Sequence, residues 1–295
     1  MILVTGGTGF VGRHLVARLV SEGEQVRVLA RRAVDLQGAE VIAGDVTDQS
    51  SLRPALEGCD IVVHLVGIIR ETRGQSFRRV HVAGARNVIE ACRQARVRRL
   101  LHMSALGTRP RAASRYHRSK WEAEQLVRAS GLAAAIFRPA VMFGKGGAFL
   151  PMIRSIAALP PVIPIIGNGM NLLQPIWVED VVACFVEAIR SGRAGATAPD
   201  PRCDSYELGG PESYGFEQLV DLIAESEGIE KPKVHLPVWL MRPAAALLSR
   251  LSLRFPLTPD QLTMLLEDSV CDISEMRQTF GVEPASLREH LSEGA

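Results

Sequence analysis

The chain has few of the residues on which several specialised protein classes depend. Its 5 cysteines among 295 residues are scattered, without a C-x-x-C pair or a cysteine–histidine cluster. This pattern argues against a disulfide framework and against a zinc site, so we predict reduced thiols and no metal. The 34 basic and 32 acidic residues nearly cancel. Because nucleic-acid binding calls for a basic face, we predict no nucleic-acid partner.

Long hydrophobic runs are also missing. No run of about 18 uncharged apolar residues is present, which excludes a membrane-spanning helix. A strand-like segment follows Met1 directly, so we expect no signal peptide and a cytoplasmic location. Residues 238–253 mix apolar side chains with arginines, a pattern suited to a partner groove or a membrane surface. We therefore keep open a respiratory-complex partner, or a peripheral position at the inner face of the membrane.

The first half of the chain alternates strand-like and helix-like segments. Strands are predicted at residues 2–4, 25–30, 40–43, 61–65, 100–103 and 133–137. Segments with helical spacing of apolar residues lie between them, at residues 11–21, 51–57, 77–95 and 116–129. This alternation predicts an α/β protein with a doubly wound parallel-sheet Rossmann fold.

The pattern changes after Gly144, where proline- and glycine-rich stretches separate shorter helices and strands. We predict a Rossmann domain for NADP(H) over residues 1–150, completed by about residues 174–210. Residues 151–295 are predicted to form a small C-terminal α/β lobe that serves a substrate or a partner.

The segment T-G-G-T-G-F-V-G, residues 5–12, joins the first predicted strand to the first helix. A helix N-terminus offers free N–H groups and a partial positive charge, and glycines allow a pyrophosphate to approach the backbone. The context predicts a dinucleotide site formed by Gly6, Thr8, Gly9, Phe10, Val11 and Gly12.

The second predicted strand ends in Arg31 and Arg32, where an NAD-preferring protein would carry an acid. Two arginines fit a 2′-phosphate, so NADP(H) is the predicted cofactor. Asp35 could still reach a ribose, which leaves NAD(H) as an alternative. Asp45 and Val46, at the end of the third predicted strand, are placed at the adenine. We assign further cofactor contacts to Leu65, Val66, Gly67, Lys120 and Pro139.

Tyr116 and Lys120 are one helical turn apart, and Ser104 ends the fifth predicted strand. Residues i and i+4 share a helix face, so the ammonium should lie beside the phenol. That cation, together with an oxidised nicotinamide, should lower the phenol pKa toward working pH. Tyr116 is then the acid/base, Lys120 its partner, and Ser104 holds the reacting oxygen.

These residues, with Arg138-Pro139, resemble extended or atypical short-chain dehydrogenases/reductases of the NAD-dependent epimerase/dehydratase type, over roughly residues 1–215. The segments S-R-Y-H-R-S-K-W-E-A-E, R-P-A-V-M-F-G and L-L-Q-P-I-W-V-E-D-V-V are most similar to the nucleotide-binding accessory (alpha-subcomplex) subunits of respiratory complex I and their bacterial relatives. The resemblance implies two functions. One is an oxidoreductase for a hydrophobic carbonyl or quinone-like substrate; the other is a subunit or assembly factor that holds NADPH without turnover.

A third alternative, a sugar-nucleotide epimerase or dehydratase, is disfavoured by two departures from that family pattern. Arg138-Pro139-Ala140-Val141 lacks the usual asparagine, and Leu172-Leu173-Gln174-Pro175 lacks the usual arginine. A sugar diphosphate would lose its cationic anchor. Two further groups are expected to be structural: His64 and His102 as hydrogen-bonded core residues, and Glu179-Asp180 as acids at a helix start.

Overall fold

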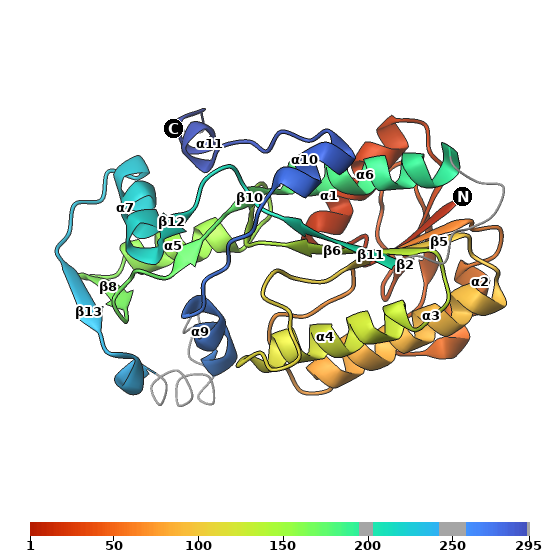
Figure 1. Ribbon diagram of the computed structural model, residues 1–295, viewed down its shortest axis with the longest axis horizontal. Coiled ribbons are helices and arrows are strands. Elements are labelled where there is room, and N and C mark those ends of the chain that lie inside the picture. Colours follow the sequence, from red (N-terminus) through yellow and green to blue (C-terminus); the bar gives the residue numbers. More distant parts are fainter. Residues whose placement is uncertain (195–202, 242–257, 294–295) are drawn as a thin grey trace.

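The computed structural model describes residues 1–194, 203–241 and 258–293. Seven strands form the main sheet in the order β11-β6-β5-β4-β1-β2-β3 (Figure 1). Every pairing in this sheet is parallel. The strands are β1 (Ile2–Thr5), β2 (Val26–Ala30), β3 (Glu40–Ala43), β4 (Ile61–His64), β5 (Arg99–Met103), β6 (Ala134–Pro139) and β11 (Cys203–Leu208). The strand order reverses between β1 and β4, and ligands of such sheets bind beyond the carboxyl ends of the strands at this point.

Helices cover both faces of the sheet (Figure 1). One face carries α1 (Phe10–Ser21), α6 (Val178–Ala194) and α10 (Ser274–Phe280), which share one apolar core with the strands. The other carries α2 (Leu52–Ala55), α3 (Gly84–Gln94) and α4 (Arg115–Arg128), next to the 3-10 turn η1 (Gln49–Ser51) and the π-helix η2 (Arg78–Ala83). Because side chains of one strand alternate between these two cores, both faces are buried. The predicted doubly wound Rossmann fold is confirmed.

A smaller lobe lies beyond the carboxyl ends of the strands. It contains α5 (Phe149–Ala157), α7 (Phe216–Ser226), α9 (Pro259–Leu265) and α11 (Leu287–Glu293). Three two-stranded sheets join it: β8 (Ile163–Ile166) with β13 (Lys233–Leu236), β7 (Met142–Phe143) with β10 (Ile176–Trp177), and β9 (Leu172–Leu173) with β12 (Tyr214–Gly215). Helix α10 leaves the lobe and packs on α6 and β11, so the end of the chain contributes to both parts.

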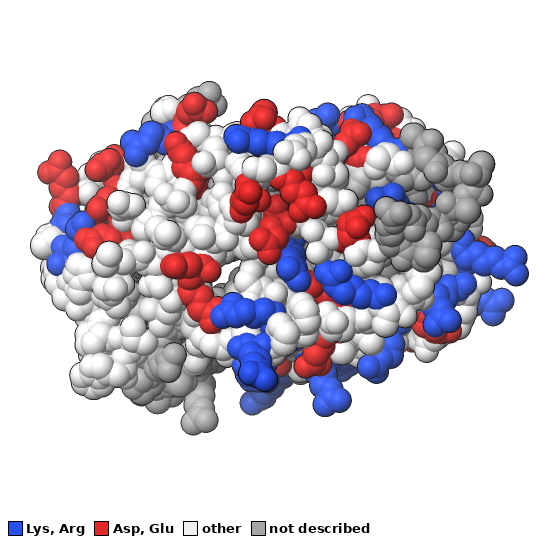
Figure 2. All heavy atoms as spheres, in the orientation of Figure 1, with Lys and Arg blue, Asp and Glu red and all other residues white. Residues whose placement is uncertain are grey.

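The surface carries charges of both signs. On the face shown in Figure 2, lysines and arginines are interspersed with acids, and the lower left of this view is largely uncharged. The exposed large apolar residues of the described chain are concentrated in the lobe and include Met170, Trp239 and Leu240. Within the described ranges, no helix is long and apolar enough to cross a membrane.

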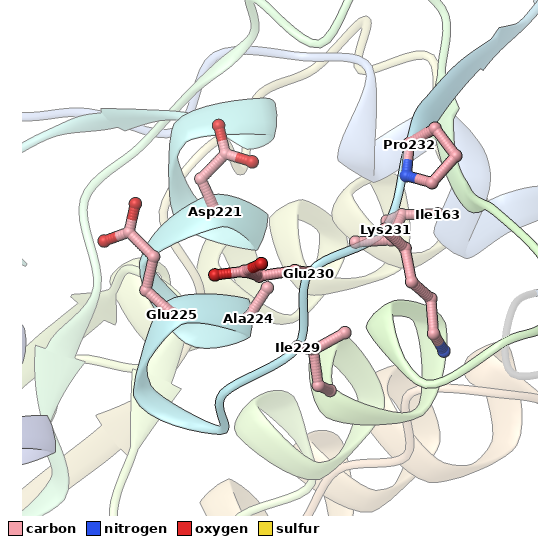
Figure 3. Close-up of a pocket in the computed structure, with 8 residues that line it drawn as sticks. All are labelled: Ile163, Asp221, Ala224, Glu225, Ile229, Glu230, Lys231 and Pro232. Atoms are coloured by element: carbon pink, nitrogen blue, oxygen red, sulfur yellow. The ribbon is translucent and has the colours of Figure 1, made fainter.

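A cleft on the lobe lies between α7 and the chain that leads into β13 (Figure 3). Its walls carry three carboxylates, from Asp221, Glu225 and Glu230. The Lys231 ammonium instead donates to carbonyls at the end of α5, at 2.8 Å for Ala158. In the described residues no group of three His, Cys, Asp or Glu side chains could hold a metal ion. We therefore assign no chemistry to this cleft.

Candidate active site

The glycine loop connects β1 to α1 through a turn that needs glycine. Gly6 has a φ of +82°, a conformation that other residues rarely adopt. A Cβ atom on Gly12 would lie 2.1 Å from the Gly6 carbonyl oxygen, so α1 could not pack this closely with a larger residue. Gly9 is the N-cap of α1, and no side chain caps the helix. The first amides of α1 thus have no side-chain acceptor at the cap, which fits the phosphates of a dinucleotide.

One cavity runs from this loop across the ends of the neighbouring strands. It brings together nine of the predicted cofactor residues: Gly6, Thr8, Gly9, Arg31, Asp45, Val46, Leu65, Val66 and Gly67. These residues follow the carboxyl ends of β1, β2, β3 and β4, which lie on both sides of the point where the strand order reverses. This is where a Rossmann sheet holds a dinucleotide.

Some residues predicted to bind the cofactor do not line this cavity, and others do not end the strand as predicted. Phe10 and Pro139 line a second cavity, while Val11 and Gly12 are buried where α1 packs. Arg32 is exposed and lies outside the lining of both cavities. Asp45 and Val46 follow β3, which ends at Ala43, instead of ending it. The cofactor role of all these residues stays a prediction.

The sequence did not indicate Arg79, which also lines the first cavity. It lies on η2 and donates to the Gly74 carbonyl at 3.2 Å. We found no motif in the sequence around Arg79. Its position near Arg31 depends on how the sheet folds, and the sequence alone does not reveal it. A second cation therefore joins Arg31 in the cavity.

The second cavity, of about 350 Å³, opens between the Rossmann sheet and the lobe. Ser104 and Tyr116 both line it, as predicted for residues that share a reacting group. Most of its other walls are apolar, with Met152, Leu173 and Met264 from the second half of the chain. The charged residues in the described lining are two acids, Glu267 and Asp268.

Lys120 bridges the region between the two cavities. Its ammonium donates to the Met103 carbonyl at 3.0 Å. A Cβ atom on Gly67 would lie 3.2 Å from the Lys120 Nζ, so Gly67 leaves space for the ammonium. Ser104 directly follows β5 (Arg99–Met103), whose end agrees with the predicted range of residues 100–103, and its amide donates to the Phe137 carbonyl at 2.7 Å. These contacts fix the backbone under the three predicted catalytic residues.

Burial is the largest influence on the pKa values of Tyr116 and Lys120, the two predicted catalytic residues on α4. It raises the pKa of Tyr116 to about 12 and lowers the pKa of Lys120 to about 8, with the Glu124 charge acting in the opposite direction on Lys120. The prediction that Lys120 lowers the phenol pKa is therefore wrong for the protein alone, because withdrawal from water is the stronger effect. The contribution of an oxidised nicotinamide stays a prediction.

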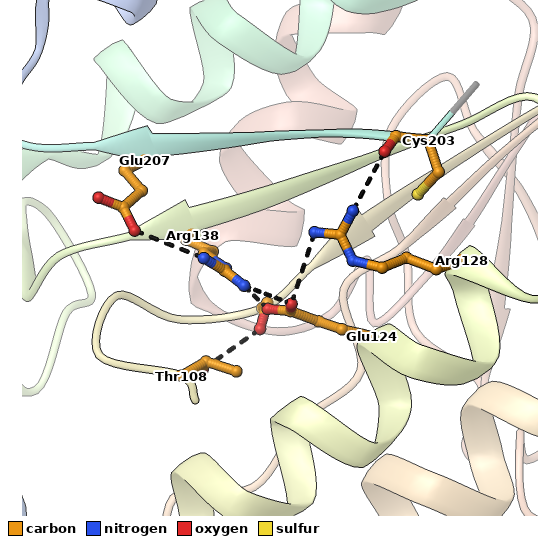
Figure 4. Close-up of polar contacts among 7 residues, drawn as sticks. Thr108, Glu124, Arg128, Arg138, Cys203 and Glu207 are labelled. Atoms are coloured by element: carbon orange, nitrogen blue, oxygen red, sulfur yellow. Dashed lines mark hydrogen bonds and ion pairs between the residues drawn. The ribbon is translucent and has the colours of Figure 1, made fainter. Parts of the chain in front are cut away.

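A buried ion pair fixes α4 to the sheet (Figure 4). The Arg138 guanidinium on β6 donates to both carboxylate oxygens of Glu124, at 2.9 and 2.6 Å. The Glu124 side chain is fully buried. Arg138 also reaches Glu207 on β11 at 3.5 Å. Glu124 lies one turn beyond Lys120, so this pair sets how the Tyr116–Lys120 face of the helix meets the sheet.

The start of α4 is held by the lobe as well as by its own N-cap. The Ser114 hydroxyl accepts from the His117 amide at 3.1 Å. The Asp260 carboxylate on α9 accepts from the amides of Arg115 and Tyr116, at 2.7 and 3.0 Å. A lobe residue thus binds the backbone of the predicted acid/base itself.

The histidines behave differently from expectation. His64 shares a hydrogen bond of 2.7 Å with the Thr5 hydroxyl, but its Nε2 has no partner in the described chain. Both ring nitrogens of His102 also lack one there. Both are buried core residues, as predicted, but the expected hydrogen bonding is incomplete, and the two rings stack with their centroids 5.3 Å apart. Glu179 and Asp180 do lie at the start of α6, as predicted.

Known proteins provide an independent test. Residues 2–201 match the model of the NAD dependent epimerase/dehydratase family. The chain is 35% identical over 213 residues to the ceramide reductase of Caulobacter vibrioides, covering 70% of this chain and 66% of that protein. It is 31% identical over 231 residues to the mouse (Mus musculus) mitochondrial NADH dehydrogenase [ubiquinone] 1 alpha subcomplex subunit 9, covering 75% of this chain and 59% of the subunit.

The matched segments thus span about two thirds or less of the length of these two relatives. Among solved structures, MoeE5 in complex with UDP-glucuronic acid and NAD superposes with a TM-score of 0.76. It is 22% identical, covering 99% of this chain and 96% of that chain, a likeness that shows the fold alone. The family match covers more than half of the chain and includes the glycine loop, Ser104, Tyr116 and Lys120, so the chain belongs to the NAD-dependent epimerase/dehydratase family.

Proposed function

We propose that this protein is an NADPH-dependent oxidoreductase that reduces a hydrophobic carbonyl compound, with quinone-like compounds as a related substrate class. The observation that carries the proposal is the second cavity, where Ser104 and Tyr116 meet apolar walls contributed by both the Rossmann part and the lobe. Apolar pockets with a few polar groups at one end are typical of sites for small hydrophobic molecules. The name of the ceramide reductase points in the same direction.

The chain's own residues are suited to handling a proton. The reduced nicotinamide, when bound, supplies hydride to the carbonyl carbon. With a pKa raised to about 12, the Tyr116 phenol is protonated at neutral pH and can give its proton to the carbonyl oxygen. Ser104 donates a second hydrogen bond to that oxygen. The Lys120 ammonium stabilises the phenolate that remains, which then regains its proton from solvent.

A sugar-nucleotide substrate fits this cavity less well. A diphosphate calls for cations, whereas the charged groups in the described lining are the carboxylates of Glu267 and Asp268. The nearby Arg109 guanidinium is paired with Glu267 at 2.9 Å. This arrangement supports an uncharged, apolar substrate.

The preference for NADP(H) is part of the proposal. Arg31 and Arg79 line the nucleotide cavity together and would bind a 2′-phosphate. The Asp45 carboxylate lines the same cavity and accepts from the Thr47 amide at 2.8 Å, so an NAD(H) ribose also has a polar partner. Calorimetric titration of both nucleotides against the wild type and Arg31→Asp tests the preference. Equal wild-type affinities would contradict it.

A second candidate is a subunit or assembly factor of respiratory complex I that holds NADPH without turnover. The observation in its favour is the match to the mitochondrial alpha subcomplex subunit, whose name places that protein in NADH dehydrogenase. Such a protein would need the nucleotide cavity, but Tyr116 would not have to transfer a proton.

One experiment separates the two candidates. The nucleotide retained by the purified protein is identified by mass spectrometry, and NADPH fluorescence is then followed with long-chain ketones and a short-chain ubiquinone. Turnover that falls by about 10² to 10⁴ in Tyr116→Phe, with nucleotide affinity unchanged, supports the enzyme. No oxidation by any acceptor, with a large nucleotide-dependent rise in melting temperature, supports the structural role.

A further inference from the structure

His117 is a cavity residue to which the reaction proposed above gives no role. It follows Tyr116 on α4 and lines the second cavity with only 6% of its surface exposed. The two rings meet edge to face, with their centroids 5.3 Å apart. Gly107 packs against the imidazole, and a Cβ atom there would lie 3.1 Å from the His117 Cε1, 3.5 Å from its Nε2 and 3.6 Å from its Nδ1. Glycine at this position therefore leaves room for the polar edge of the imidazole.

The hydrogen bonding of this ring is incomplete. The His117 Nδ1 is buried and has no partner in the described chain. Two hydroxyls in the loop after β5 do not serve this ring, since Ser104 donates to Thr108 at 3.4 Å and no hydrogen bond joins either of them to His117 in the described chain. Buried polar atoms in native proteins are nearly always paired, so an unpaired nitrogen on a side chain that lines the cavity points to a group that the cavity receives.

The charged groups around His117 are already committed. Arg109 and Glu267 pair with each other at 2.9 Å, and Asp260 binds the amides at the start of α4. Burial is the largest influence on the imidazole and lowers its pKa. The ring is therefore neutral at neutral pH, with one nitrogen as a donor and the other as an acceptor. A neutral ring of this kind suits a hydroxyl or an amide better than it suits a charge.

We propose that His117 is a specificity residue that hydrogen-bonds a second polar group of the substrate, a hydroxyl or an amide next to the carbonyl that Tyr116 and Ser104 hold. The second group must be close to the carbonyl, because the two rings are in contact. The substrate class is then a ketone with an adjacent hydroxyl or amide and a long apolar tail. This inference rests on the proposed oxidoreductase function.

The test compares decan-2-one with 1-hydroxydecan-2-one, which share one tail and differ in a single hydroxyl beside the carbonyl. With NADPH, the wild type is expected to show a kcat/KM about tenfold higher for the hydroxyketone, the usual value of one hydrogen bond. His117→Phe keeps the ring and removes both nitrogens. In this variant the kcat/KM values for the two ketones should become about equal, because KM for the hydroxyketone rises. The kcat and KM for decan-2-one should stay within about twofold of the wild-type values.

Two further variants sharpen the comparison. His117→Asn, whose amide places a polar atom near the Nδ1 position, should recover part of the preference. His235→Phe, at a half-exposed histidine on β13, should keep all of it. The same ratio in the wild type and in His117→Phe, or no wild-type preference, would overturn the assignment.

A readout without turnover distinguishes this inference from the proposed function. If neither ketone is reduced, the oxidoreductase proposal fails, and binding to the protein–NADPH complex is followed through the ¹⁵N imidazole resonances of His117. The hydroxyketone should shift the Nδ1 resonance and decan-2-one should not. This measurement uses the wild-type protein, so it also applies if His117→Phe does not fold. No shift with the hydroxyketone overturns the inference.

Discussion

The ammonium of Lys120 is withdrawn from water by the ends of β4 and β5 and by its own helix. Only 2% of the residue is exposed. The spacing of Tyr116 and Lys120 was enough to predict that they share a helix face, since that depends on local geometry alone. The burial of Lys120 was not predictable, because it depends on Gly67 and Met103, which the fold brings in from other parts of the chain.

The burial of Lys120 predicts an unusual dependence of stability on pH. Its pKa is about 8 in the folded protein, against 10.5 when exposed, so unfolding takes up a proton between these values. Stability should therefore rise from about pH 8 to 10.5. Below about pH 8 the buried cation lowers the free energy of unfolding by roughly 3 kcal/mol, which is this lowering of the pKa converted to free energy. Nucleotide-free Lys120→Met should melt higher than the wild type at pH 7 and should lack the alkaline rise.

Thermal melts at pH 7, 8, 9 and 10 test this expectation. The control is Lys145→Met at an exposed lysine, which should keep the wild-type pH profile. A lower melting temperature for nucleotide-free Lys120→Met at pH 7 would show that the hydrogen bond to Met103 outweighs the cost of burial. Nucleotide affinity should fall in the same variant, as expected if the charge serves binding.

Glu124 and Arg138 provide a second prediction at this scale. Removing the Glu124 charge leaves the largely buried Arg138 with only its 3.5 Å contact to Glu207, and breaking a buried ion pair typically costs about 3–5 kcal/mol. Glu124→Gln should lose a free energy of unfolding of that order, while the double variant Glu124→Leu/Arg138→Leu should recover much of it. Urea denaturation measures both. The exposed Glu122 on the same helix is the control, and an equal loss in Glu122→Gln would contradict the argument.

Helix α4 illustrates what can be predicted for a whole element. Its extent, the shared face of Tyr116 and Lys120, and the Ser114 N-cap all follow from nearby residues. The second cap, Asp260, lies about 145 positions along the chain, and its contact depends on how the lobe packs. The same distinction explains why the sequence did not indicate Arg79 or the second cavity. Strand ends and glycine turns depend on nearby residues, whereas the cavity walls from α9 and η2 depend on tertiary folding.

The Asp260 contact predicts an effect on catalysis from outside the Rossmann core. Asp260→Ala leaves two amides of α4 without their acceptor, which should cost about 1–2 kcal/mol of stability. Because the Tyr116 backbone is directly involved, turnover of the ketone substrates should fall while nucleotide affinity stays near the wild-type value. Asp272→Ala, at an exposed aspartate that accepts from the Ser274 amide at 2.9 Å, is the control. Weaker nucleotide binding without a loss of turnover would contradict this coupling.

For the whole molecule, the layers and the sheet could be predicted from the sequence, and the structure confirms both. The parallel sheet follows from alternating strands and helices, which local patterns reveal. The position of α10 does not, because Met276 and Phe280 pack on a core formed far earlier in the chain. The boundary between residues 1–150 and 151–295 stays a prediction.

The segment predicted to dock on a partner or membrane, residues 238–253, lies outside the described residues from 242 onward. In the described part, Trp239 is 75% exposed, whereas Met241 is buried against Leu262 of α9. We propose that Trp239 contacts a membrane surface, as interfacial tryptophans do. Trp239→Glu should reduce flotation with vesicles of mixed zwitterionic and anionic lipid by several-fold. Met170→Glu, at an equally exposed lobe residue, should not, and equal binding of all three proteins would argue against docking here.

The position of α10 also bears on how the protein emerges from the ribosome. Strands β1 to β6 are complete by residue 139 and can begin to pair early, because domains generally fold from the N-terminus during synthesis. The seventh strand becomes available only at residue 208, and the apolar surface of α6 and β11 stays uncovered until residues 274–280 have left the exit tunnel. We therefore expect the nascent chain to expose this apolar face of α6 and β11 between the synthesis of residue 208 and that of residue 280.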